Sequence, residues 1–309
     1  MAVIAVENLA KSFNGSPVIE DISFQVSGGE VFGFLGPNGA GKTTTIRIVL
    51  GLLQPTAGTA RVMGSDLGRN DALRRSVGVL LENNGLYGRL SAYDNLRYYA
   101  DIYRVADPDT RIRDLLDLVD LTEFAESPIG NFSVGMQRKM GLARAIIHDP
   151  AILFLDEPTS GLDPEAQRLV RDLILDLSRE KNRTVFLNSH NLDEVQRICT
   201  NVAILQQGRI RAYDSVEHLR ASEQTPVYLL TLADPAAAER ACTLVRGVEG
   251  VGSCSVDGDV VTVSLDGAAA PRMLRELVRA GVDLIEARRV TRSLEDVYLD
   301  VVHRSGGEV

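Results

Sequence analysis

Short apolar runs alternate with longer amphipathic segments along the first two thirds of the chain. The pattern predicts strands at residues 3–13, 22–26, 30–36, 151–158 and 183–190, and a hairpin at residues 201–210. Helical periodicity and capping residues favour helices at residues 44–53, within 91–147 and at 164–181. Because fully apolar strands are typical of sheets that are covered on both faces, this order predicts an α/β fold.

The composition changes at residues 221–226, where we expect a linker, and a different pattern follows. Strands are predicted at residues 227–232, 251–256, 260–265 and 282–289, and helices at residues 235–246, 271–280 and 293–302. The first six of these elements have the β-α-β-β-α-β order of a split βαβ unit. The prediction is therefore a domain at residues 1–222, with a helical subdomain at about 84–148, and a small C-terminal α+β domain at residues 227–303.

Composition and charge narrow the possible partners. The 309 residues suffice for one large or two modest domains with real cores. The net charge of -9 comes without a basic stripe, so no nucleic acid is expected. No apolar run approaches the ~20 residues of a membrane-spanning helix, and the N-terminal residues lack the pattern of a signal peptide. The cysteines, Cys199, Cys242 and Cys254, have no C-x-x-C spacing, and we expect three reduced thiols in a cytosolic protein.

Residues 36–43, "GPNGAGKT", match the phosphate-loop pattern G-x-x-x-x-G-K-[ST] between a predicted strand and a predicted helix. Glycines let the backbone N–H groups point inward at phosphate oxygens, Lys42 supplies a positive charge, and the Thr43 hydroxyl can bind Mg²⁺. The helix that follows presents its N-terminus to the anion. The predicted nucleotide contacts are Gly36, Pro37, Asn38, Gly39, Ala40, Gly41, Lys42, Thr43 and Thr44.

Two acids at a strand end supply the second half of the predicted site. Asp156 ends the apolar run "ILFLD" and can hold Mg²⁺, while Glu157 can act as the general base for an attacking water. His190 ends another apolar strand, where a polar contact to a γ-phosphate is useful. Ser160 and Asp163 follow the acids and could equally cap the helix that begins at Pro164.

Phe13 is expected in a loop after the first strand, and we favour stacking on adenine over a place in the core. With Phe13 included, the chain resembles the ATP-binding subunit of an ABC transporter. The matching order is the aromatic loop, the phosphate loop at 36–43, a signature at 132–136, "ILFLDE" at 152–157, a D-loop at 160–163 and the switch His190. The tail, with "SLEDVYLDVV", is similar to a narrower group, the ATPases of ABC-2-type exporters of the daunorubicin-resistance type.

The resemblance implies a homodimer in which each ATP lies between the phosphate loop of one subunit and the signature of the other. The signature residues would be Ser133, Val134, Gly135 and Met136, which stand where L-S-G-G-Q is usual; Ser133 and Gly135 keep the essential hydroxyl and the close backbone approach. It also implies separate transmembrane permease subunits, a place on the inner face of the cell membrane, and export of drugs, antibiotics or lipids. The alternative is a soluble ABC-type ATPase with a regulatory role outside transport.

In the family, a Gln usually stands where this chain has Glu82, and its amide contacts Mg²⁺. We expect Glu82 to remain a metal-sensing residue, or else to point to solvent. Tyrosines crowd the window that follows it. Leu96, Tyr99 and Tyr103 share a helical face and could be core, whereas Tyr87, Tyr93 and Tyr98 are predicted to dock the membrane partner, with packing inside the helical subdomain as the alternative.

Overall fold

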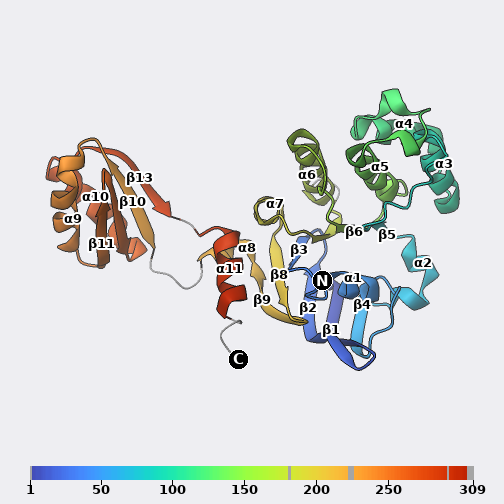
Figure 1. The fold of residues 1–309 in the computed structure, drawn as a ribbon, viewed down its shortest axis with the longest axis horizontal. Coiled ribbons are helices and arrows are strands. Elements are labelled where there is room, and N and C mark those ends of the chain that lie inside the picture. Colours follow the sequence, from blue (N-terminus) through green and yellow to red (C-terminus); the bar gives the residue numbers. More distant parts are fainter. Residues whose placement is uncertain (1, 180–181, 222–225, 291, 305–309) are drawn as a thin grey trace. The chain divides into compact units, whose positions relative to one another are not determined.

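The computed structural model describes residues 2–179, 182–221, 226–290 and 292–304 (Figure 1). The chain forms two compact units, one of Met1–Val216 with the C-terminal residues from Tyr298 onward, and the other of Glu217–Val297. The sequence-based boundary at residue 222 therefore differs by a few residues, and residues 222–225 of the expected linker lie outside the described part. The last helix, α11 (Leu294–Arg304), is divided between the units instead of belonging to the second one alone.

A six-stranded sheet carries the first unit, with the strand order β5-β6-β7-β3-β8-β9. All neighbours are parallel except β8 and β9, which form the expected hairpin. The strands are β3 (Val31–Leu35), β5 (Val77–Leu80), β6 (Ile152–Asp156), β7 (Thr184–Asn188), β8 (Asn201–Gln206) and β9 (Arg209–Ser215). Strands β3, β6 and β7 are buried along their whole length, as their unbroken apolar sequences predict.

A smaller antiparallel sheet, in the order β2-β1-β4, packs with the six-stranded sheet around a shared core. Its strands are β1 (Ala2–Phe13), β2 (Ser16–Ser27) and β4 (Ala57–Val62). Four phenylalanines, Phe24, Phe32, Phe34 and Phe186, lie with ring centroids 5.4–6.1 Å apart, and all are buried. These aromatic contacts pack β2 of the smaller sheet against β3 and β7 of the six-stranded sheet.

The helices of the first unit begin where the sequence supplies capping side chains. Ser91 caps α3 (Ala92–Tyr103), Asp107 caps α4 (Pro108–Leu118) and Ser133 caps α5 (Val134–Ile146), and these three helices lie together as a helical segment (Figure 1). The other helices are α1 (Lys42–Val49), α2 (Asp71–Arg74), α6 (Pro164–Arg179), α7 (Leu192–Ile198) and α8 (Val216–Ala221), of which α8 lies at the boundary of the units. Helix α1 ends at Val49, just before Gly51.

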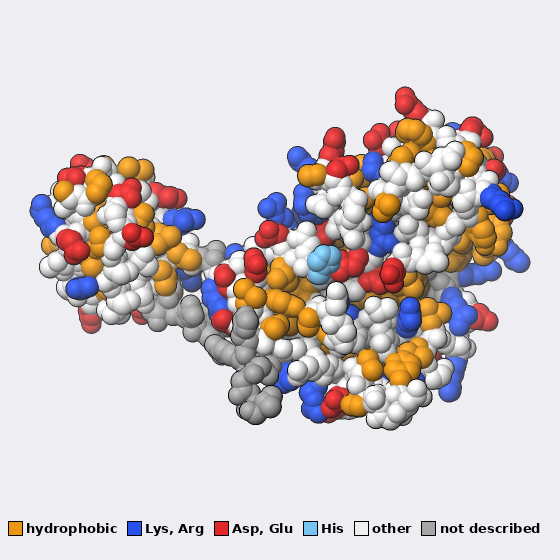
Figure 2. All heavy atoms as spheres, viewed as in Figure 1, with side chains coloured by type: hydrophobic (Ala, Val, Ile, Leu, Met, Phe, Trp, Pro, Cys, Tyr) orange, Lys and Arg blue, Asp and Glu red, His pale blue; other side chains and the backbone are white. Residues whose placement is uncertain are grey.

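The second unit has the predicted split βαβ order and an antiparallel sheet in the order β11-β12-β10-β13. Its elements are β10 (Val227–Leu232), α9 (Ala238–Arg246), β11 (Val251–Asp257), β12 (Val260–Leu265), α10 (Ala270–Arg279) and β13 (Leu284–Val290). Acidic and basic side chains are interspersed over the face of each unit seen in Figure 2.

The expectation of three reduced thiols is wrong for two of them. Cys242 on α9 and Cys254 on β11 form a disulfide, with Cα atoms 5.8 Å apart, and Cys199 is a free, buried cysteine. The two bonded residues are 12 positions apart, and only the packing of α9 on β11 brings them together. Burial raises the pKa of the Cys199 thiol, so this side chain is an inert part of the core.

Candidate active site

The loop between β3 and α1 forms a cradle whose shape depends on glycine. Gly36 has φ 156° and Gly41 has φ 106°, and a Cβ atom on Gly36 would lie 2.2 Å from the carbonyl oxygen of Leu205. Lys42 is buried, and its Nζ donates to the carbonyl oxygens of Gly36 and Pro37 at 2.6 and 3.1 Å. Burial lowers the pKa of Lys42, while the carboxylates of Glu157 and Asp156 oppose that shift.

The acid pair stands at the carboxyl end of β6, next to the end of β7. Asp156 is buried and pairs in register with Asn188, whose side-chain amide donates to an Asp156 carboxylate oxygen. The Glu157 N–H donates to the Asn188 carbonyl oxygen at 2.8 Å. Because parallel strands end at the same edge of the sheet, residues 32 positions apart in sequence form one polar cluster.

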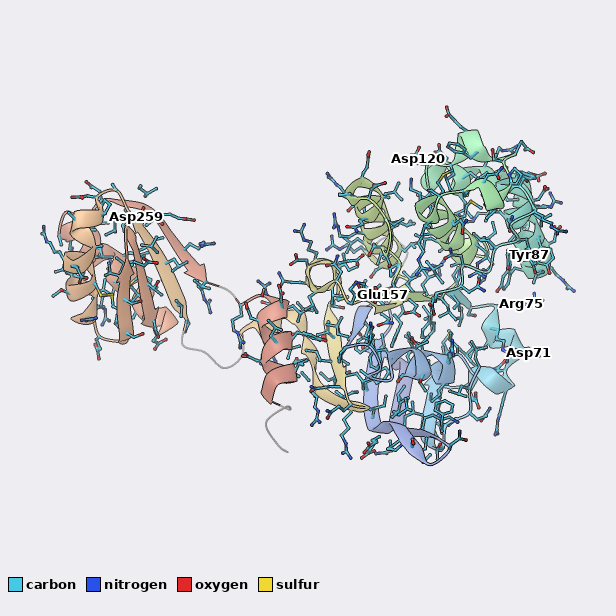
Figure 3. The ribbon with its side chains drawn as sticks, in the orientation of Figure 1. Asp71, Arg75, Tyr87, Asp120, Glu157 and Asp259 are labelled. Atoms are coloured by element: carbon cyan, nitrogen blue, oxygen red, sulfur yellow. A yellow bond between two sulfur atoms is a disulfide. The ribbon has the colours of Figure 1, made fainter. Side chains whose placement is uncertain are left out.

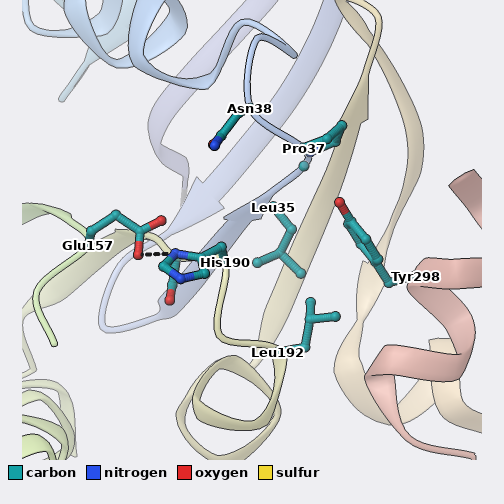
Figure 4. Close-up of a pocket in the computed structure, with 9 residues that line it drawn as sticks. Leu35, Pro37, Asn38, Glu157, His190, Leu192 and Tyr298 are labelled. Carbon is teal, nitrogen blue, oxygen red and sulfur yellow. Dashed lines mark hydrogen bonds and ion pairs between the residues drawn. The ribbon is translucent and has the colours of Figure 1, made fainter. Parts of the chain in front are cut away.

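Glu157 has a backbone conformation that is rare for a residue with a side chain. Its φ is 51°, in the left-handed region, and its Oε2 lies 2.7 Å from Nδ1 of His190 (Figure 4). The side chain of His190 is 71% exposed and that of Glu157 is 28% exposed. A strained backbone that aims a carboxylate at an exposed imidazole is typical of a functional site.

Two cavities open on this cluster. One of about 380 Å³ is lined by Asn38, Lys42, Thr43, Glu82, Asn84, Val134, Arg138, Asp156, Glu157, Ser160 and Asn188. The other, of about 430 Å³, is lined by Leu35, Gly36, Pro37, Asn38, Glu157, Ser189, His190, Leu192 and Tyr298 (Figure 4). The structure thus brings the phosphate loop, the acid pair, the predicted metal ligands and His190 together around adjoining spaces that share Asn38 and Glu157.

Oxygen donors in the first cavity fit a small hard cation. Thr43, Glu82 and Asp156 all line it, and the hydroxyl and carboxylate oxygens they offer are the ligands that Mg²⁺ prefers. Within the described residues, no group of three or more His, Cys, Asp or Glu side chains has the geometry of a complete metal site.

The predicted signature and the predicted D-loop lie beside each other within one chain. The Ser133 Oγ accepts from the Met136 N–H at 3.2 Å and so caps α5, and Asp163 caps α6 through the Ala166 N–H at 2.8 Å. A Cβ on Gly135 would come within 3.4 Å of the Leu162 side chain. Val134 is 70% exposed at the start of α5, where an approaching partner could reach it.

Phe13 is not in a loop, contrary to the expectation. It is the last residue of β1 and pairs with Ser16 of β2, because Asn14 and Gly15 both have positive φ and close the hairpin in two residues. Phe13 is 45% exposed, and Lys11 Nζ lies 4.9 Å from its ring centroid. The exposed ring excludes a place in the core.

The tyrosine window divides into two groups. Tyr87 and Tyr98 are exposed, with ring centroids 5.1 Å apart, and Figure 3 places Tyr87 well apart from Glu157. Tyr93 donates its hydroxyl to Asp109 within the helical segment, and Tyr103 stacks on His148. The Tyr99 ring contacts both rings of the first group, and its hydroxyl donates to the Gly85 carbonyl oxygen. Tyr87 and Tyr98 are therefore the exposed tyrosines of this window, and the other three are half-buried.

Sequence reasoning missed three residues at the site. Asn188 continues an apolar strand and could have been suspected from its place at the strand end. Arg138 is buried on α5 and reaches the backbone of Asp156 and Glu157, and Tyr298 comes from the far end of the chain on α11 to line the second cavity (Figure 4). Nothing in the local sequence marks these two contacts, because both depend on tertiary packing.

Comparisons with known proteins agree with this geometry. Residues 19–160 match the family described as ABC transporter. The chain is 34% identical over 308 residues to the uncharacterized ABC transporter ATP-binding protein YhcH of Bacillus subtilis, covering 99% of this chain and 98% of that protein. It is 32% identical over 311 residues to the bacitracin transport ATP-binding protein BcrA of Bacillus licheniformis, covering 99% of each.

A further relative is the fluoroquinolones export ATP-binding protein Rv2688c of Mycobacterium tuberculosis, 41% identical over 206 residues, which are 66% of this chain and 67% of that protein. Among solved structures, an ATP-binding subunit of an ABC transporter is similar at 30% identity with a TM-score of 0.66, over 71% of this chain and 92% of that chain. None of the described helices is long and apolar enough to cross a membrane.

The fold and the site define an ATPase of the phosphate-loop class. The chain belongs to the family of ABC transporter ATP-binding subunits, whose characteristic activity is ATP hydrolysis.

Proposed function

We propose that ATP is hydrolysed at the cluster where β3, β6 and β7 end. The observation that carries this proposal is the convergence of Lys42, Asp156, Glu157 and His190 around two cavities that share Asn38 and Glu157. Lys42 and the loop amides would hold the phosphates. Glu157 would take a proton from the attacking water, and His190, 2.7 Å from its carboxylate, would orient that carboxylate and contact the γ-phosphate.

Mg²⁺ is the metal that this site would use. Thr43 and Asp156 would hold it, with Glu82 as a further oxygen donor in the same cavity, and the bound ion would neutralise charge on the phosphates. Glu82 adds a negative charge that an amide would not, so ATP binding should depend more steeply on Mg²⁺. An unchanged Mg²⁺ dependence of ATP affinity in Glu82→Gln would contradict this role.

We propose a homodimer that closes on ATP, with Ser133, Val134, Gly135 and Met136 of one subunit facing the phosphate loop of the other. The N-terminus of α5, with its positive partial charge, and the Ser133 hydroxyl are suited to a phosphate oxygen. Ser160 and Asp163 would contact the partner at the same interface. A γ-phosphate between two copies would make closure depend on ATP.

Closure would drive permease subunits at the inner face of the cell membrane, and the cargo would be a drug, an antibiotic or a lipid. The full-length similarity to BcrA and the match to Rv2688c, named for bacitracin transport and fluoroquinolone export, support export. Tyr87 and Tyr98 would dock the permease. The buried Asn95 fixes the Tyr87 backbone, since its Oδ1 accepts from the Tyr87 N–H at 2.8 Å and its Nδ2 donates to the Tyr87 carbonyl oxygen at 3.0 Å.

Inverted membrane vesicles that contain the chain and its permease would test this function. We expect ATP-dependent accumulation of bacitracin or a fluoroquinolone, its loss in Gly135→Asp, and release of Tyr87→Ala from the vesicles with its ATPase activity intact. Tyr93→Phe is the matched control for a tyrosine that bonds inside the subdomain. ATPase activity without vesicle association or transport would favour the soluble regulatory ATPase instead.

A further inference from the structure

Arg138 on α5 is a buried cation that joins two segments of the active site. It is 6% exposed, although arginine is seldom buried unless its charge is compensated. Its Nη1 donates to the carbonyl oxygen of Leu81 and to Oδ1 of Asn84, each at 2.8 Å. Its Nη2 donates to the carbonyl oxygens of Asp156 and, at 2.8 Å, Glu157.

These four acceptors are neutral, being three backbone carbonyls and one side-chain amide. Burial lowers the pKa of Arg138, and the more distant carboxylates of Asp156, Glu157 and Glu82 oppose that shift. A buried charge held mainly by dipoles is a weak source of stability, and an apolar side chain of similar volume often serves as well or better. The burial of Arg138 is therefore better explained by the groups that it holds in place than by stability alone.

Arg138 holds the backbone of Glu157 in place. Glu157 has φ 51°, a conformation that persists only where surrounding contacts fix it. Its N–H donates to the Asn188 carbonyl oxygen, and its own carbonyl and that of Asp156 both accept from Arg138. The Ser160 N–H also donates to the Glu157 carbonyl oxygen, at 3.2 Å. Four hydrogen bonds thus fix the two peptide groups that flank the Glu157 Cα, and Arg138 supplies two of them.

We propose that Arg138 is a positioning residue for Glu157, which locks the left-handed backbone at the strand end and ties it to the loop at Leu81–Asn84. The inference rests on the proposed role of Glu157. The guanidinium is a rigid plane, so its two nitrogens hold the loop and the strand end in a fixed relation. Any displacement of α5 or of this loop would thereby move the Glu157 carboxylate relative to the phosphate loop.

Arg144 provides a matched control. It lies on the same helix, its Nη2 also donates to a backbone carbonyl, that of Val79 on β5, and its Nε, like that of Arg138, is buried without an acceptor among the described residues. Its guanidinium lies 5.2 Å from the Tyr99 ring centroid. Arg144 thus resembles Arg138 in helix, residue type and bonding to a strand of the sheet, and differs in making no described bond to Asp156 or Glu157.

The test measures kcat, KM, ATP affinity and the urea midpoint for Arg138→Met, Arg138→Lys, Arg144→Met and Arg144→Lys, with Glu157→Gln alongside. We expect kcat to fall about 100-fold in Arg138→Met, the effect of a ~1 Å misplacement at a reacting centre. Lysine keeps the charge and loses the planar fork, so kcat should fall about tenfold in Arg138→Lys. KM and ATP affinity should stay within about threefold, because Arg138 bonds the backbone and no residue of the phosphate loop.

The Arg144 variants should lose a similar amount of stability and keep kcat within about twofold. Equal kcat values for the Arg138 and Arg144 pairs, compared per folded molecule, would overturn the inference, and Arg138→Lys decides the matter if Arg138→Met does not fold. A Glu157→Gln protein that hydrolyses ATP at the wild-type rate would instead overturn the proposed function. An inactive Glu157→Gln with active Arg138 variants would overturn the positioning role alone.

Discussion

The two units pack helices against a β-sheet, but their interiors differ. In the ATP-binding unit, the core contains buried Lys42, Arg138, Asp156 and Glu194, together with buried amides and hydroxyls. Within the described residues of Glu217–Val297, every buried side chain is apolar or a cysteine of the disulfide. Burying a polar group is unfavourable unless it is paired, so its presence needs a reason.

The difference indicates where the chemistry lies. In the ATP-binding unit, one cavity at the ends of β3, β6 and β7 is lined by four of the buried polar side chains and by Glu157 with its strained backbone; the four are Lys42, Arg138, Asp156 and Asn188. The C-terminal unit shows an apolar core and keeps its charges on the surface, which is what stability alone would produce. We therefore expect the first unit to carry the reaction, and the second to contribute through its surface.

The largest effect should come from truncating one buried leucine on a central strand of each unit. Leu187 on β7 and Leu230 on β10 are both 0% exposed, and truncating either to alanine should destabilise its own unit by about 2–5 kcal/mol. Leu187→Ala should also lower the temperature at which ATPase activity is lost, because β7 ends at Asn188, which bonds Asp156.

Calorimetry combined with ATPase measurements at rising temperature would check both variants. Leu230→Ala should shift one unfolding transition and leave the ATPase profile unchanged. Equal loss of activity in the two variants would show that the units do not fold independently, and the contrast between them would fail.

A smaller effect should appear with pH. His148 stacks on Tyr103 with ring centroids 3.8 Å apart, its Nε2 lies 3.2 Å from the Val77 carbonyl oxygen, and burial lowers its pKa from 6.5 to about 4. Between these pH values the unfolded chain binds a proton at His148 that the folded chain does not. The free energy of unfolding is therefore unaffected by His148 above pH 6.5, and it decreases as the pH falls from 6.5 towards 4.

The expected slope is at most about 1.4 kcal/mol per pH unit, and it should concern the transition of the ATP-binding unit. His148→Phe keeps an aromatic ring on Tyr103 and removes the titration, so its urea midpoint should change less over this range. Identical pH profiles for the wild type and His148→Phe would contradict the burial of a neutral imidazole.

The sequence was most informative where chemistry dictates residue type at a strand end. Lys42, Asp156, Glu157 and His190 could be chosen because a phosphate loop and a hydrolytic site need these groups after apolar strands, and the split βαβ order followed from its turns. The sequence could not predict three features, because each depends on how elements distant in sequence pack: the contacts of Arg138, the place of Tyr298 and the Cys242–Cys254 disulfide. The place of Phe13 was missed because the Asn14-Gly15 turn extends the strand pair to its last residue.

The most direct test of the central claim is ATP hydrolysis by Glu157→Gln, with Glu165→Gln as the control for an exposed acid on the neighbouring helix α6. We expect Glu157→Gln to bind ATP as the wild type does, but to hydrolyse it about 10²–10⁴-fold more slowly, the usual contribution of a general base. Glu165→Gln should hydrolyse ATP at the wild-type rate. A Glu157→Gln protein with undiminished hydrolysis would contradict the claim that the polar cluster at the ends of β3, β6 and β7 is the catalytic centre.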